Sequence, residues 1–135
     1  MIIKNDALIA SFRGAASCEY CRKPCRETCA HHCFTVRSGR LDIPHNLIRL
    51  GMPFQCPCHD AFHKAAKIKR DDFLAVVARR ERVTVEVIER VVYCLRFLPR
   101  SPAGWQIREA VGQLCEGSRR VVEGILKGEG LTWET

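Results

Sequence analysis

The sequence predicts an α+β protein with a cysteine- and histidine-rich module at residues 1–82 and a mostly helical domain at residues 83–135. Seven of the nine cysteines and all five histidines lie between Cys18 and His63. Apolar residues at helical spacing dominate the later part of the chain. The net charge of +7 belongs to the first module, because the second contains seven basic and seven acidic residues.

Local signals in the first module predict short elements. Residues 18–33 are rich in turn signals, residues 34–36 favour a strand, and residues 46–50 favour a short strand or a turn of helix. Apolar residues within 59–68 fall near helical spacing, so we expect a helix there. An aspartate in the pair 71–72 is expected to cap the next helix.

The second half is more regular. Thr84 is expected to cap a helix that ends before Pro99, and the Ser-Pro pair at 101–102 is expected to open another. Gly and Ser at 117–118 would separate that helix from a third, and residues 131–133 favour a final strand.

This order of helices and strand resembles a winged helix or helix-turn-helix, with Arg119 and Arg120 at the start of the recognition helix. The zero net charge argues against DNA reading there, and a neutral helical domain more often packs, dimerises or binds protein. We therefore expect a homodimer or a protein partner through residues 83–135. Cys94 and Cys115 fall on apolar helix faces and are expected in the core.

Composition narrows the class of protein. No apolar run approaches the roughly 20 residues that span a bilayer, and charges flank the apolar residues 7–12 too closely for a signal peptide. We therefore expect a cytoplasmic protein with no membrane partner. An odd number of cysteines without a secretion signal favours thiolate metal ligands over disulfides. The pI near 9.1 favours a polyanionic partner such as nucleic acid.

The histidines form a pattern that suits a metal ion. His59 and His63 are four residues apart on an expected helix, so both imidazoles project from one face and can share an ion. The adjacent pair His31 and His32 can supply a third ligand and one ring left free to take a proton. A metal ion can offset the charge that develops on a bound phosphate, and a free imidazole beside it can activate water. Together these groups can hydrolyse a phosphodiester bond.

The motif CEYC…AHH…DIPHNLIRL…CHDAFH resembles the HNH endonucleases of phages and bacteria across residues 8–80. The resemblance implies a ββα-metal fold and metal-dependent hydrolysis of DNA. It also implies a role for each motif residue: a general base at His32, a residue that holds the loop and orients the base at Asn46, and ligands of the catalytic ion at His31, His59 and His63. The ion would be Mg²⁺, Mn²⁺, Ni²⁺ or Zn²⁺.

Members of this family often hold a structural zinc between two cysteine pairs. Cys18 and Cys21 match the first pair, and Cys58 matches the last ligand. The family position of the third ligand falls on Gly51, so we expect Cys56 to replace it, although only one residue separates Cys56 from Cys58. The resemblance thus implies a structural Zn²⁺ held by four thiolates.

Three further cysteines, Cys25, Cys29 and Cys33, have no place in the motif. One of them could complete the zinc site instead. The interpretation we favour is that they are small buried apolar residues.

Basic residues beside a phosphodiesterase site are expected to contact DNA phosphates, with a merely solvated surface as the alternative. They are Arg37, Arg40, Lys64, Lys67, Lys69 and Arg70. A second hypothesis for the whole chain is a catalytically inactive, zinc-binding module that binds nucleic acid. A redox or iron–sulfur protein is a poorer hypothesis, because it leaves the histidine and asparagine spacing unused.

Overall fold

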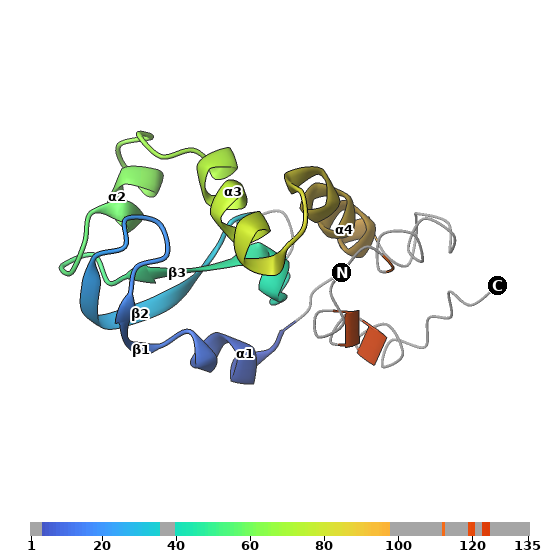
Figure 1. Ribbon diagram of the computed structural model, residues 1–135, viewed down its shortest axis with the longest axis horizontal. Coiled ribbons are helices and arrows are strands. Elements are labelled where there is room, and N and C mark those ends of the chain that lie inside the picture. The colour runs from blue at the N-terminus through green and yellow to red at the C-terminus, as the bar shows by residue number, and fades with distance from the viewer. Residues whose placement is uncertain (1–3, 36–39, 98–111, 113–118, 121–122, 125–135) are drawn as a thin grey trace.

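The computed structural model of the chain describes residues 4–35, 40–97, 112, 119–120 and 123–124. Helices and strands are both present, which confirms the α+β class (Figure 1). Their order is α1 (Asp6–Ser11), β1 (Gly14–Ser17), β2 (Pro24–His32), the 3₁₀ turn η2 (Pro44–Asn46), β3 (Leu47–Gly51), α2 (Cys58–His63), α3 (Arg70–Glu81) and α4 (Val85–Phe97).

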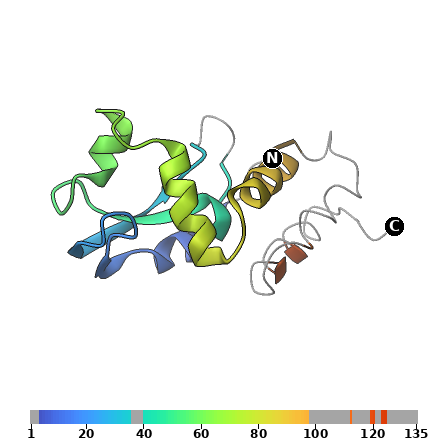
Figure 2. The same ribbon diagram turned by 45° about the horizontal axis from the view of Figure 1, so that its top comes forward.

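The three strands form one antiparallel sheet in the order β1-β2-β3. In the β2–β3 pair His31 lies opposite Ile48 and Thr28 lies opposite Gly51. Helix α3 lies across the β2–β3 part of the sheet, with α2 toward one end and α4 beyond α3 (Figures 1 and 2). The chain from β2 to α2 therefore makes an antiparallel hairpin followed by a short helix.

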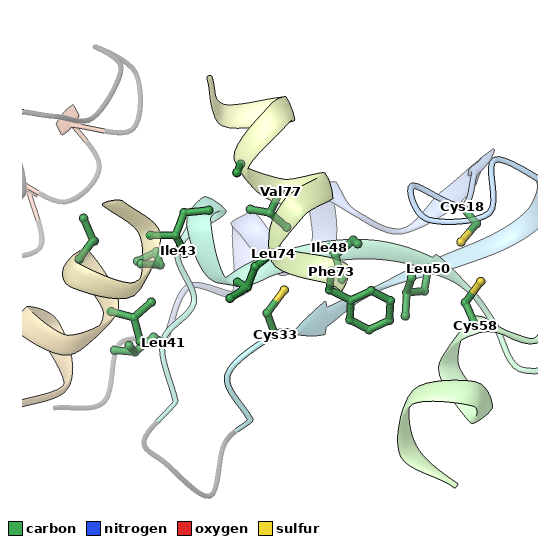
Figure 3. Packing of buried hydrophobic residues seen from close by; sticks show 14 of the residues in the cluster. Cys18, Cys33, Leu41, Ile43, Ile48, Leu50, Cys58, Phe73, Leu74 and Val77 are labelled. Carbon is green, nitrogen blue, oxygen red and sulfur yellow. The ribbon is translucent and has the colours of Figure 1, made fainter. Parts of the chain in front are cut away.

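The core lies between α3 and the sheet. Phe73, Leu74 and Val77 of α3 pack in one buried cluster with Ile48 and Leu50 of β3 (Figure 3). Buried residues of α4, namely Ile88, Val91, Val92 and Leu95, belong to the same cluster. The core therefore continues across the expected domain boundary after residue 82, and that boundary stays a prediction.

The prediction for residues 18–33 is wrong in its second half, where β2 is a nine-residue strand. The predicted strand at 34–36 is also wrong for Phe34 and Thr35, which lie beyond the end of β2. For residues 46–50 the strand alternative is confirmed by β3. Helix α1 and strand β1 have no counterpart in the sequence predictions.

The predicted helix over 59–68 is too long. Helix α2 ends at His63, and Ala66 takes a left-handed conformation with φ 50°. Backbone N–H groups of Lys67 and Ile68 then bond back to the carbonyl of Ala61, which closes the turn. Loss of the helical φ at residue 66 explains the early end.

The predicted cap of α3 is displaced, and that of α4 is confirmed. The residue preceding α3 is Lys69, whose N–H donates to the carboxylate of Asp72 at 2.9 Å. Asp72 thus stabilises the helix from inside its first turn. Thr84 precedes α4, and its Oγ1 accepts the Val87 N–H at 3.2 Å.

Several expectations fall outside the described residues. These are the helix end at Pro99, the Ser-Pro pair, the break at 117–118, the final strand, the side chain of Cys94 and all of Cys115. Within the described residues, no helix is both long and apolar enough to cross a bilayer.

His45 gives the fold a pH dependence. Its side chain is fully buried in η2, and neither ring nitrogen has a hydrogen-bond partner among the described residues. Burial lowers the pKa of His45 below its ordinary value of 6.5; Glu81 raises it and Arg80 lowers it further. Below pH 6.5 the His45 ring therefore binds a proton in the unfolded chain but stays neutral in the folded chain. The free energy of unfolding falls as the pH drops through 6.5.

Replacing His45 with leucine should remove this loss. We expect the free energy of unfolding of the variant to rise relative to that of the natural chain, by up to about 1.4 kcal/mol for each pH unit below pH 6.5. Urea unfolding of both chains between pH 5 and pH 8 measures the difference, and contributions from the other histidines cancel because both chains share them. Parallel stability curves would show that His45 does not titrate on unfolding.

Candidate metal centres and active site

Three imidazoles from two elements meet at one end of the β2–β3 hairpin. The ligand atoms of His31, His59 and His63 lie within 4.8 Å of one another. His31 comes from β2, whereas His59 and His63 are one turn apart on α2. Ring centroids of His31 and His63 are 4.7 Å apart, and those of His59 and His63 are 4.6 Å apart. The structure therefore brings together the three residues expected to bind the catalytic ion.

The environment of the His31 side chain suits a metal ligand. It is 8% exposed, and its Nε2 has no hydrogen-bond partner within the described part of the chain. The rings of Phe62 and Phe73 pack edge-on against it. Burial, assisted by neighbouring histidines, lowers the pKa of His31 to about 4, so the ring is neutral and keeps a lone pair for a cation. Three imidazoles suit Zn²⁺ or Ni²⁺ better than Mg²⁺.

His32 has a different environment. Neighbouring side chains on a strand point to opposite faces, and His32 is outside the three-imidazole group. Its Nε2 lies 2.7 Å from Oδ1 of Asp42. Together His31, His32 and His63 line a surface cleft of about 200 Å³ with Ala30 and Thr35. His32 thus reaches the cleft with one nitrogen fixed by a carboxylate.

Asp42 is the residue that the sequence prediction missed. Its side chain is fully buried and accepts hydrogen bonds from the Asn5 N–H at 2.8 Å and from the Arg40 guanidinium at 2.9–3.1 Å. Burial alone would raise the pKa of Asp42, but hydrogen bonds from Arg40, Asn5 and His32 hold it below its usual value. A lone aspartate in a loop carries no periodic signal, so only the folded geometry identifies it.

Asn46 is buried where the two arms of the β2–β3 connection meet. Its Oδ1 accepts the Phe34 N–H at 2.7 Å, and its Nδ2 donates to the carbonyls of Phe34 and Leu41. Its own carbonyl accepts the Cys33 N–H at 2.8 Å. Asn46 therefore fixes the chain directly after His32, which accords with the loop-holding role that the resemblance implies.

Four cysteine sulfurs form a second group. Those of Cys18, Cys21, Cys56 and Cys58 lie within 4.8 Å of one another and could hold a metal ion. The Cys18 and Cys58 sulfurs point toward each other from the turn after β1 and from the start of α2 (Figure 3). Burial alone would raise the pKa of the Cys18 thiol, but backbone hydrogen bonds from Cys21, Gly51 and Tyr20 lower it. Four thiolates at this spacing suit a structural zinc.

Of the three unplaced cysteines, Cys25 and Cys33 are buried, and Cys29 is partly exposed. Burial raises the pKa of the Cys33 thiol to about 12, so this residue stays protonated. Cys33 belongs to the hydrophobic cluster and lies apart from Cys18 and Cys58 (Figure 3).

The basic side chains expected to contact DNA phosphates differ in whether they already interact with other residues. The Arg40 guanidinium is engaged with Asp42, and the Arg70 guanidinium lies 4.5 Å from the centre of the Phe34 ring. Lys64 is exposed and 3.7 Å from Asp60. Lys67 and Lys69 are exposed on the segment between α2 and α3. Arg37 lies outside the described residues.

Comparisons with known proteins return no matching family model, no matching curated protein and no matching solved structure.

Proposed function

We propose that this protein is a metal-dependent endonuclease of the HNH type that hydrolyses DNA phosphodiester bonds. The observation that carries the proposal is the contrast between two neighbouring residues, His31 and His32. His31 converges with two further imidazoles, whereas His32 is outside that group and is oriented by a buried carboxylate. The antiparallel β2–β3 hairpin followed by α2 supports the ββα-metal arrangement that the motif implies.

The roles of the residues follow from this contrast. Nε2 of His32 is held by Asp42 and His32 lines the cleft, so Nδ1 is the nitrogen that would take a proton from an attacking water. Arg40 and the Asn5 N–H keep the Asp42 carboxylate charged, and that charge stabilises the imidazolium which results. A divalent cation held by His31, His59 and His63 would supply positive charge that stabilises the transition state at phosphorus.

Incubation with supercoiled plasmid DNA tests the proposal. Protein with Ni²⁺, Mn²⁺, Zn²⁺ or Mg²⁺ should convert the plasmid to nicked or linear forms, and excess chelator should stop the reaction. Binding of DNA without cleavage in any of these ions would instead support the catalytically inactive zinc-binding module.

Asp42 should control the rate through His32. Replacing Asp42 with asparagine keeps the shape but removes the charge, so we expect plasmid cleavage to slow by up to the roughly 10²-fold expected for loss of the base itself. Metal affinity should stay near that of the natural chain, because Asp42 is outside the three-imidazole group. An undiminished cleavage rate in a folded Asp42→Asn variant would remove Asp42 from the mechanism.

The basic segment after α2 should contact DNA backbone. Changing Lys67, Lys69 and Arg70 together to glutamine should make the log–log dependence of affinity on salt shallower, by roughly 0.9 for each phosphate that is no longer neutralised. A matched control removes the same charge at Arg22, Lys23 and Arg26, near the opposite end of β2 from His32. Fluorescence anisotropy with a duplex oligonucleotide measures both slopes. Equal slopes in the two triple variants would contradict binding of phosphates by this segment.

A further inference from the structure

Two cysteine sulfurs share the space left by a missing side chain at the end of β3. A Cβ atom on Gly51 would lie 2.6 Å from the Cys25 sulfur and 2.9 Å from the Cys56 sulfur. Both sulfurs therefore border the same point, although they come from different segments. Cys25 and Cys56 are each almost fully buried.

The backbone explains this convergence. Because Thr28 lies opposite Gly51, the first residues of β2 run past the end of β3. The chain after Gly51 continues beside them: the Met52 N–H donates to the Glu27 carbonyl at 3.1 Å, and the Arg26 N–H donates to Gln55 Oε1 at 2.7 Å. This loop delivers Cys56 to the side of Cys25.

The two thiols differ in their present partners. Cys56 belongs to the group of four sulfurs within 4.8 Å of one another, and Cys25 does not. The Cys25 thiol donates instead to the Lys23 carbonyl at 3.3 Å. A tetrahedral zinc with Zn–S bonds of about 2.3 Å needs four sulfurs about 3.8 Å apart. Cys25 supplies a fifth sulfur next to one of these four, because its sulfur and that of Cys56 border the same point at Gly51.

We propose that Cys25 is a reserve ligand of the four-cysteine centre, which takes the coordination position of Cys56 when that sulfur is removed or blocked. The inference rests on the zinc centre and not on the nuclease activity. When Cys56 is replaced by alanine or its sulfur is alkylated, the bond between the Cys56 sulfur and the ion is lost. The Cys25 sulfur then bonds the ion, and the proton of the Cys25 thiol passes to water. No electron is transferred, and the centre keeps four thiolates.

Cobalt(II) reconstitution of the full chain tests this, because thiolate-to-cobalt charge-transfer absorption counts sulfur ligands and is not produced by the imidazole site. The variants are Cys25→Ala, Cys56→Ala, the double variant, and Cys58→Ala as the control for loss of a ligand. Both Cys25→Ala and Cys56→Ala should keep the intensity of the natural chain. The double variant and Cys58→Ala should lose about one quarter of it and bind cobalt at least about tenfold more weakly.

A Cys56→Ala spectrum equal to that of the double variant or of Cys58→Ala would overturn the proposal. So would a double variant that keeps full intensity, because another group would then be the replacement. The absence of any thiolate–cobalt band from the natural chain would instead refute the zinc centre itself.

If Cys56→Ala does not fold, slow alkylation of the zinc-loaded natural chain tests whether Cys25 can replace Cys56 as a ligand. Peptide mapping of chains that retain zinc should find the label on Cys25 in some molecules and on Cys56 in others, and never on both in one molecule. A label on Cys25 alone, or on neither residue, contradicts the exchange.

Discussion

Replacing His32 with alanine should lower the rate of plasmid cleavage by about 10²-fold or more and leave metal affinity nearly unchanged. The His32 imidazole lines the cleft but does not belong to the three-imidazole group, and its Nε2 is held by Asp42. Loss of a general base typically costs about 10²–10⁴ in rate. Cleavage rates at saturating metal, together with calorimetric titration of the metal, measure the two effects separately.

His31→Ala is the matched comparison, because the two residues are adjacent on β2. This variant should lose metal affinity and activity together, since His31 contributes a buried nitrogen to the cluster. If His32→Ala also loses metal affinity, then the base and ligand roles of the two histidines are exchanged or shared.

Replacing Cys18 with alanine should release the zinc ion that the four cysteines would hold and lower stability by about 3 kcal/mol or more, equivalent to a melting temperature lower by roughly 10 °C. Cys18 belongs to the turn after β1, whereas Cys56 precedes α2 and Cys58 is its first residue. The ion would join these segments, so its loss should also loosen His59 and His63. Zinc content, thermal unfolding and cleavage should therefore fall together.

Cys33→Ala is the control, because Cys33 is equally buried and outside the sulfur group. It should keep its zinc and lose only the stability expected for a small cavity. Equal zinc content in the Cys18 and Cys33 variants would contradict the four-cysteine centre.

The sequence predicted the groups of side chains better than the elements that carry them. The spacing of His59 and His63 needs only one helical turn to place both rings together, and that turn exists although the helix is shorter than expected. Strand β2 escaped prediction because its sequence, Pro-Cys-Arg-Glu-Thr-Cys-Ala-His-His, has few of the branched and aromatic residues typical of strands.

Other features depend on contacts distant in sequence. The sequence favoured Cys56 as the third ligand but left Cys25, Cys29 or Cys33 open as its replacement. The loop that runs beside the start of β2 places Cys56 in the group of four sulfurs. Asp42 is likewise identified by its bonds to Asn5, Arg40 and His32. Such tertiary contacts have no local signature in a single sequence.

Anomalous diffraction at the zinc edge, from crystals of the zinc-loaded chain, would locate both metal ions. We expect two zinc peaks in each chain, one among the sulfurs of Cys18, Cys21, Cys56 and Cys58 and one among His31, His59 and His63. The His32 ring should contact neither ion and should remain bonded to Asp42. A single peak, or an ion bonded to His32, would contradict this expectation.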